Sequence, residues 1–129
     1  MKRALVIDDD PVMRELIRET LLGEFEVETV GSGYRAMLST QGSHFDLITL
    51  DLLMPGIDGL ETLAHIKELT PATPVIIVTG LQMRSLHESA LRAGAYSVVM
   101  KPFGAMQLLN EARTACSGAA SASTETDAS

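Results

Sequence analysis

The segment that most constrains the architecture spans residues 45–56 and reads Phe45-Asp46-Leu47-Ile48-Thr49-Leu50-Asp51-Leu52-Leu53-Met54-Pro55-Gly56. Residues 47–50 are apolar with almost no alternation, which is typical of a short strand buried on both faces of a parallel sheet. The run stops at Asp51, and a Met-Pro-Gly turn prevents the strand from continuing. Since ligands of open parallel α/β sheets bind beyond the carboxyl ends of the strands, Asp51 is expected at such a site. An aspartate that merely caps a loop is the alternative on this segment alone.

Length and composition indicate one globular domain. The chain of 129 residues can form a single core but not two, and its 46% hydrophobic content suits a folded protein. The formal charge of -7, with ten scattered basic residues, argues against nucleic-acid binding, which needs clustered Lys and Arg. No apolar run approaches the roughly 18 residues of a membrane span, and no secretory signal is expected. The single cysteine, Cys116, cannot form an internal disulfide and suits the reducing cytoplasm.

Five strands are expected to alternate with five helices along the chain. The strands fall over residues 3–7, 25–30, 47–50, 75–78 and 96–100. Residues 25–30 alternate apolar and polar side chains, which predicts a strand at the sheet edge. Connections of this length imply right-handed βαβ units and a three-layer, doubly wound α/β domain. We expect this domain to span residues 1–116, followed by a disordered tail or linker of small, polar residues over 117–129.

The helices are placed by caps, glycines and prolines. Asp10 is expected to cap a first helix that ends near residue 22, and the second helix ends near Thr40, before a loop over residues 41–43. Asp58 can cap the third helix, which the prolines after Thr70 terminate. The fourth helix is expected over residues 84–93. In two helices, apolar side chains at helical spacing are expected to face the core. They are Leu60, Leu63 and Ala64 in the third helix, and Phe103, Met106, Leu109, Ala112 and Ala115 or Cys116 in the last.

Polar side chains follow four of the five expected strands, as Asp8 and Asp9, Asp51, Thr79 and Lys101. Because the carboxyl ends of parallel strands lie on one edge of a sheet, these side chains are expected to be neighbours. At about 4 Å and an effective dielectric constant of about 20, each pair of carboxylates would repel by around 4 kcal/mol. A divalent cation relieves this repulsion, and hard oxygen ligands suit Mg²⁺. With an ammonium and a hydroxyl beside them, the carboxylates predict phosphoryl transfer onto a carboxylate, which gives an acyl phosphate.

Four stretches extend this pattern, namely Val6-Ile7-Asp8-Asp9-Asp10, Asp51-Leu52-Leu53-Met54-Pro55-Gly56-Ile57-Asp58-Gly59, Val78-Thr79-Gly80 and Val99-Met100-Lys101-Pro102-Phe103. In this order and at this spacing they resemble the four signatures of the response-regulator receiver domain of two-component signalling. The resemblance covers about residues 3–116. It implies a flavodoxin-like fold, with a five-stranded parallel sheet in the order 2-1-3-4-5 flanked by five helices.

The resemblance also implies a role for each residue at the sheet edge. Asp51 is expected to be the phosphoacceptor, phosphorylated by a partner histidine kinase or phosphotransfer protein. Asp9 and Asp51 would hold Mg²⁺ directly and Asp8 mostly through water, while the backbone carbonyl of Leu53 would supply a further ligand. Lys101 would pair with the phosphoryl group, and it precedes a proline that is usually cis in this fold.

Switching is implied to begin at Thr79, whose hydroxyl would reorient toward the phosphoryl oxygens and bias a surface formed by the fourth helix, fifth strand and fifth helix. That surface would bind a downstream output domain or protein, and phosphorylation can also promote a dimer. Val98 occupies the position where the family usually has a switching Tyr or Phe. Either Tyr96, two residues earlier and on the same face by strand alternation, takes over that role, or the movement is transmitted without an aromatic rotamer. Leu53 and Leu81 occupy the positions that tune phosphoryl lifetime, and their apolar side chains predict a long-lived phosphoaspartate.

Two other classes of function compete with the regulatory switch. A haloacid-dehalogenase-type phosphatase also uses an aspartyl nucleophile and Mg²⁺, but it normally carries a second Asp at the position of Leu53. A constitutive interaction module would leave the polar set at the strand ends unexplained. His44, His65 and His87 share no ligand spacing, so no metal or phosphodonor role is expected of them. The chain is therefore expected to be a regulatory phosphoacceptor domain and not an enzyme.

Overall fold

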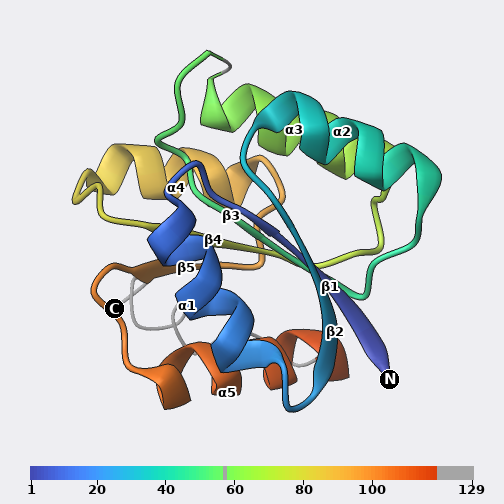
Figure 1. The fold of residues 1–129 in the computed structure, drawn as a ribbon. Coiled ribbons are helices and arrows are strands. Elements are labelled where there is room, and N and C mark those ends of the chain that lie inside the picture. Colours follow the sequence, from blue (N-terminus) through green and yellow to red (C-terminus); the bar gives the residue numbers. More distant parts are fainter. Residues whose placement is uncertain (57, 119–129) are drawn as a thin grey trace.

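Five parallel strands form the central layer of the computed structural model, which describes residues 1–56 and 58–118 (Figure 1). The strands are β1 (Lys2–Ile7), β2 (Phe25–Val30), β3 (Leu47–Leu50), β4 (Val75–Thr79) and β5 (Ser97–Met100). They lie in the order β2-β1-β3-β4-β5, and every neighbouring pair is parallel. This arrangement confirms the expected flavodoxin-like order 2-1-3-4-5.

Burial along the strands follows their position in the sheet. Every residue of β3 and β4 is buried, as continuous apolar runs predict for strands covered on both faces. In β2 only Phe25 is buried, and the other residues are half-buried or exposed. The alternating sequence of β2 therefore belongs to an edge strand, as predicted.

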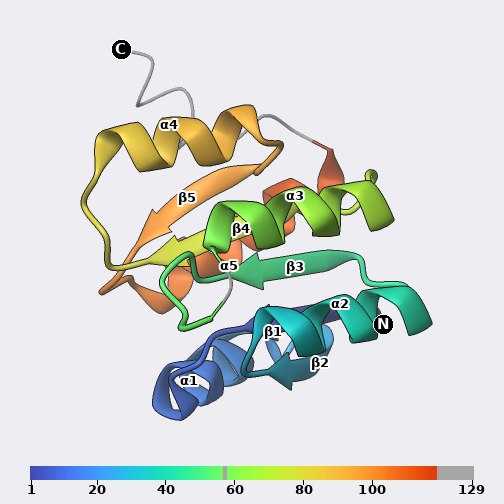
Figure 2. The same cartoon turned by 90° about the horizontal axis from the view of Figure 1, so that it is seen from above.

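Five helices cover the two faces of the sheet, as α1 (Pro11–Leu21), α2 (Gly33–Gly42), α3 (Gly59–Leu69), α4 (Arg84–Arg92) and α5 (Ala105–Ser117). Helices α2, α3 and α4 lie on one face, while α1 and α5 lie on the other (Figures 1 and 2). On the first face, Leu63 and Ile66 of α3 pack in one hydrophobic cluster with Ile48 of the sheet. On the second face, Ile17 of α1 and Leu108 of α5 pack in another cluster with other strand residues. Two separate cores thus lie on opposite faces of the sheet.

Two aspartate caps fix the loops that follow β1 and β3. The Asp10 carboxylate accepts a hydrogen bond from the Val12 N–H at 3.0 Å and begins α1. The Asp58 carboxylate accepts one from the Leu60 N–H at 2.8 Å and begins α3. Both caps agree with the sequence prediction, and each satisfies backbone donors that a helix start would otherwise leave unpaired.

The structure corrects the predictions for α2 and α3. Helix α2 continues to Gly42, although residues 41–43 were expected to be a loop, and the Ser43 N–H still donates to the Ser39 carbonyl at 3.0 Å. In α3 the predicted inward residue Ala64 is exposed, and Thr62 and Ile66 are buried instead. Burying the larger Ile66 side chain removes more apolar area from water than burying an alanine methyl would, so the helix turns that face inward.

The inward face of α5 also differs from the predicted stripe. Met106 is 59% exposed, and the face that packs on the sheet carries Leu108, Glu111, Ala112 and Ala115. A buried glutamate was not expected there, but the Ser97 hydroxyl of β5 donates a 2.7 Å hydrogen bond to its carboxylate. Burial of a polar side chain is less costly when such a hydrogen-bond partner is present.

Helix α5 ends one residue beyond the expected domain boundary at 116. Its last residue is Ser117, and Gly118 follows with a φ of 82°, the left-handed cap for which glycine is favoured. The rest of the expected tail, residues 119–129, lies outside the described residues. Among residues 1–56 and 58–118, no helix combines the length and apolar character that crossing a lipid bilayer requires.

Candidate functional site

The ends of β1, β3 and the segment after β5 meet at one ammonium group. The Lys101 Nζ donates hydrogen bonds to Asp8 Oδ2 at 2.8 Å and to Asp51 Oδ2 at 2.9 Å. Asp8 is 1% exposed and Asp51 is 6% exposed, so both carboxylates are almost fully removed from water. Parallel pairing of the strands brings these three residues together although they are far apart in the sequence.

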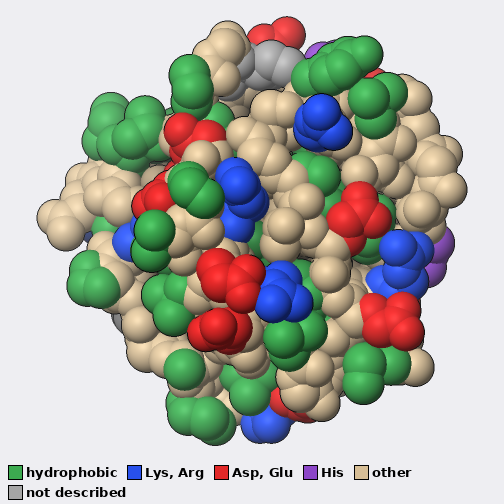
Figure 3. Space-filling model, in the orientation of Figure 1, with side chains coloured by type: hydrophobic (Ala, Val, Ile, Leu, Met, Phe, Trp, Pro, Cys, Tyr) green, Lys and Arg blue, Asp and Glu red, His purple; other side chains and the backbone are tan. Residues whose placement is uncertain are grey.

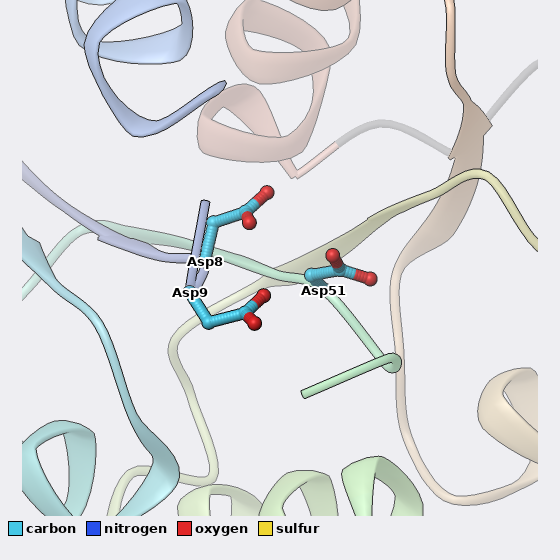
Figure 4. Close-up of side chains that lie close together, drawn as sticks. All are labelled: Asp8, Asp9 and Asp51. Carbon is cyan, nitrogen blue, oxygen red and sulfur yellow. The ribbon is translucent and has the colours of Figure 1, made fainter. Parts of the chain in front are cut away.

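A third carboxylate, that of Asp9, completes an acidic cluster. Ligand oxygens of Asp8, Asp9 and Asp51 all lie within 4.8 Å of one another, and Asp9 is exposed. The side chains leave the ends of β1 and β3 and project to the same side (Figure 4). Three carboxylates and the Lys101 ammonium leave two negative charges, which a divalent cation would balance. An all-oxygen donor set with an open side suits Mg²⁺, which retains several of its waters.

Backbone hydrogen bonds orient the two buried carboxylates. The Asp10 N–H donates to Asp8 Oδ1 at 2.9 Å, and the Leu53 N–H donates to Asp51 Oδ1 at 2.9 Å. Lys101 uses the other oxygen of each carboxylate, so both oxygens of Asp8 and of Asp51 have a fixed direction. A carboxylate oxygen can accept more than one hydrogen bond or ligand, so these contacts leave room for a cation. The backbone of Leu53, from which a carbonyl ligand was expected, is held directly beside Asp51.

Burial and charge shift the pKa values of this site in a consistent way. Burial raises the pKa of the Asp8 carboxyl above its ordinary value, and the Lys101 hydrogen bond offsets this only in part. Burial pushes the pKa of Lys101 down, but its hydrogen bonds to Asp8 and Asp51 outweigh burial, and the pKa lies above its ordinary value. The Lys101 ammonium therefore stays charged at neutral pH.

Thr79 ends β4 beside Lys101 and is fully buried. Its carbonyl accepts a hydrogen bond from the Lys101 N–H at 2.8 Å. Its hydroxyl accepts one from the Leu81 N–H at 3.2 Å, so the hydroxyl is bound to the loop that follows β4. The Lys101–Pro102 peptide bond is cis, as the family resemblance leads us to expect.

Sequence reasoning missed Arg14 of α1. Its Nη1 donates to the backbone carbonyl of Asp8 at 2.9 Å, next to Gly31, where a Cβ would approach the same nitrogen. The arginine therefore fixes the backbone that carries the acidic pair. Its spacing from the first strand gives no specific signal, because a bond to a main-chain carbonyl leaves no motif in the sequence.

The structure separates Tyr96 from Val98. Tyr96 packs with the core under α1 and α5, and Val98 packs with the core under α2, α3 and α4, so they lie on opposite faces. The predicted shared face was wrong because β5 begins at Ser97, and strand alternation does not extend to Tyr96. The Tyr96 N–H donates to the Val75 carbonyl at the start of β4, about 13 Å along the strand from Thr79. The Tyr96 backbone is therefore held at the opposite end of β4 from Thr79.

The other candidate groups lie apart from this edge. His44 Nε2 lies 3.4 Å from Asp46 and His65 Nε2 lies 4.0 Å from Glu61, on different parts of the fold. Among the residues that the structure describes, Asp8, Asp9 and Asp51 are the one group of three with metal-ligand spacing. On the face seen in Figure 3, basic side chains are interspersed with acidic ones and form no continuous basic patch.

The fold and the site together place the chain among flavodoxin-like α/β domains that have an acidic pocket and a lysine at the carboxyl ends of the strands. Residues 4–113 match the family model of the response regulator receiver domain, and the chain belongs to that family. Such domains are regulatory phosphoacceptors of two-component systems, which interact with histidine kinases and output domains. Family members generally bind Mg²⁺ at an acidic pocket such as that of Asp8, Asp9 and Asp51.

Known relatives agree with this membership. The chain is 34% identical over 103 residues to the chemotaxis protein CheY of Halobacterium salinarum, covering 79% of this chain and 86% of that protein. It is 36% identical over 114 residues to the C4-dicarboxylate transport transcriptional regulatory protein DctD of Pseudomonas aeruginosa, covering 88% of this chain but 25% of the regulator. The crystal structure of a CheY-like receiver domain protein from Methanospirillum hungatei JF-1 superposes with a TM-score of 0.88 at 27% identity, covering 92% of this chain and 95% of that chain.

Proposed function

We propose that the chain is a phosphorylation-dependent signalling switch in which Asp51 accepts a phosphoryl group from a partner histidine kinase or phosphotransfer protein. The observation that carries this proposal is the Lys101 ammonium, bound to Asp51 at 2.9 Å and to Asp8 at 2.8 Å beside the exposed Asp9. A carboxylate nucleophile, a fixed cation and a metal-binding pair are what phosphoryl transfer to an acid requires.

In the proposed transfer, an Asp51 carboxylate oxygen attacks the phosphorus of a phosphohistidine. The new bond is a P–O bond, and the P–N bond to the donor breaks with its electron pair leaving on the imidazole nitrogen, which then takes a proton. The Lys101 ammonium pairs with a phosphoryl oxygen and keeps it in place. Thr79, when its hydroxyl turns away from Leu81, donates to another oxygen. These groups act mainly by positioning and by neutralising charge.

Asp9 and Asp51 would hold Mg²⁺ directly, Asp8 would act mostly through water, and the Leu53 carbonyl would add a ligand. When bound, Mg²⁺ neutralises charge on the phosphoryl oxygens and draws donor and acceptor together. Support comes from the spacing of the three carboxylates and from the Leu53 backbone that lies against Asp51.

Phosphorylation is proposed to change the surface of α4, β5 and α5, through which a downstream output domain or protein binds and a dimer can form. The chain spans 25% of DctD and 44% of the transcriptional regulatory protein TcrA of Mycobacterium tuberculosis, so the output of the whole protein belongs to this proposal. We further propose that residues 1–116 act as the receiver unit, with a linker after α5. A cytoplasmic location is part of the proposal, because one free cysteine suits a reducing compartment.

Phosphoryl uptake provides the test. The full chain is incubated with Mg²⁺ and acetyl phosphate, and intact mass reports the added phosphoryl group. We expect uptake in the parent protein and in Asp58→Asn, whose residue caps α3 on the same loop, and none in Asp51→Asn. Equal uptake by Asp51→Asn would refute the proposal. Absence of uptake in the parent protein would favour the constitutive interaction module, and sustained hydrolysis of a small phosphomonoester would favour the phosphatase.

A further inference from the structure

Leu81, in the loop between β4 and α4, is bound on both sides of its Cα atom. Its N–H donates to the Thr79 hydroxyl at 3.2 Å. Its carbonyl lies 2.6 Å from Nε2 of His87, and since a carbonyl can only accept, Nε2 carries the hydrogen and donates. A single loop residue therefore connects the hydroxyl at the end of β4 with a side chain of α4.

Helix α4 is only weakly held by the rest of the fold, so its contact with the preceding loop has a large effect on its position. Ala90 is the one residue of α4 that is fully buried, while Leu86 and Leu91 are half-buried against the core. Its cap residue, Met83, makes no side-chain cap hydrogen bond and is 54% exposed. A helix with so little burial and a weakly capped start can shift when its contacts to the preceding loop change.

The residues near the usual aromatic position, Val98 and Tyr96, are placed differently from this loop. Val98 has no hydrogen-bonding side chain, and Tyr96 is bound through its N–H to Val75 at the opposite end of β4. The Thr79 hydroxyl, in contrast, reaches His87 through one residue and two hydrogen bonds.

We propose that His87 is a positioning residue that transmits the movement of Thr79 to α4. This inference rests on the proposed phosphorylation of Asp51. When the Thr79 hydroxyl turns to donate to a phosphoryl oxygen, the Leu81 N–H either follows its acceptor or loses it. The Leu81 carbonyl then moves, and the His87 side chain carries the first turns of α4 with it. The imidazole thus takes the place of an aromatic rotamer on β5.

Amide hydrogen exchange of the full chain tests the inference. The protein is measured in Mg²⁺ with and without beryllofluoride, which mimics a phosphoryl group on an aspartate. In the parent protein we expect the mimic to alter exchange at the strand ends and to change exchange in α4 severalfold. His87→Ala should keep the response at the strand ends and lose the change in α4. His87→Gln, whose amide can still donate to the Leu81 carbonyl, should restore part of it.

His65→Ala provides the matched control, because His65 lies on the neighbouring helix α3 with a half-exposed side chain and should leave the α4 response unchanged. An unchanged α4 response in His87→Ala overturns the inference but leaves the proposed function intact. So does a parent protein that responds at the strand ends without any response in α4. A parent protein that shows no response at the strand ends overturns the proposed function, and the inference fails with it. If His87→Ala already changes amide exchange in α4 without the mimic, His87→Gln decides the outcome. When His87→Gln has normal exchange without the mimic but loses the α4 response, the inference is overturned.

Discussion

The Lys101 Nζ lies 2.9 Å from Asp51 Oδ2, although the two residues are separated by 50 positions in the sequence. Lys101 also binds Asp8, so one ammonium bridges two buried carboxylates and offsets their mutual repulsion. Removing a single partner from such a group leaves uncompensated charge in a poorly solvated place, which costs more than the contact itself contributes.

Lys101→Ala should therefore destabilise the fold. In buffer with a chelator we expect the free energy of unfolding to fall by about 2 kcal/mol, less than for a fully buried pair because the ammonium is partly exposed. Added Mg²⁺ should restore part of the loss by neutralising the carboxylates. Chemical denaturation in both buffers measures the effect. Lys2→Ala is the control, because Lys2 is exposed and lies at the amino end of β1, away from the acidic cluster. An equal loss of unfolding free energy in the two variants would contradict the prediction.

Mg²⁺ should stabilise the folded protein through Asp9. At a concentration one hundred times the dissociation constant, a ligand specific for the folded state raises the free energy of unfolding by about 2.7 kcal/mol. We expect this Mg²⁺-dependent shift in thermal denaturation to be largely lost in Asp9→Asn. Asp10→Asn should keep it, because Asp10 caps α1 and asparagine caps a helix equally well. A full shift in Asp9→Asn would argue against the proposed metal site.

The phosphoaspartate should persist for minutes or longer in the purified protein. Leu53 is 63% exposed beside Asp51, and neither its side chain nor that of Leu81 can orient an attacking water. We expect Leu53→Asn to shorten the half-life, measured by the decay of the phosphorylated mass after removal of acetyl phosphate. Leu69→Asn, at an exposed residue in the last turn of α3, should leave it unchanged. A half-life of seconds in the parent protein would contradict the prediction.

The start of α3 should depend on Gly59 having no side chain. A Cβ at this position would overlap the backbone of Leu52, which has no flexible end that can move aside. We expect Gly59→Ala to lower the free energy of unfolding by about 2 kcal/mol. Gly42→Ala is the matched control, since it lies exposed at the end of α2 with open space around it. It should be neutral or stabilise by up to about 0.5 kcal/mol. Similar losses in both variants would show that the close approach to Leu52 is unimportant.

Much of the fold was predictable because its signals are local. The continuous apolar runs of β3 and β4, the alternation in β2 and the caps Asp10 and Asp58 each act over a few residues. The convergence of Asp8, Asp9, Asp51 and Lys101 also followed, since parallel strands place their carboxyl ends on one edge.

The missed features depend on partners that are distant in sequence or belong to the main chain. Glu111 could be recognised as buried only with knowledge that the Ser97 hydroxyl faces it. Arg14 and His87 bind backbone carbonyls, and every residue type offers the same carbonyl. Tyr96 was assigned to the wrong face because alternation holds only within a strand, and β5 begins one residue later.

In the proposed function, in which Asp51 accepts a phosphoryl group, the central place of β3 has a consequence for the accuracy of signalling. Asp51 follows a strand that has a neighbour on either side and a helix layer on both faces, so a donor can approach it only over the loops at one rim. A donor seated on that rim blocks access for every competitor. Fidelity between cognate and foreign donors is then decided by how well each one fits the loop surface, while the intrinsic reactivity of the carboxylate can remain the same for all.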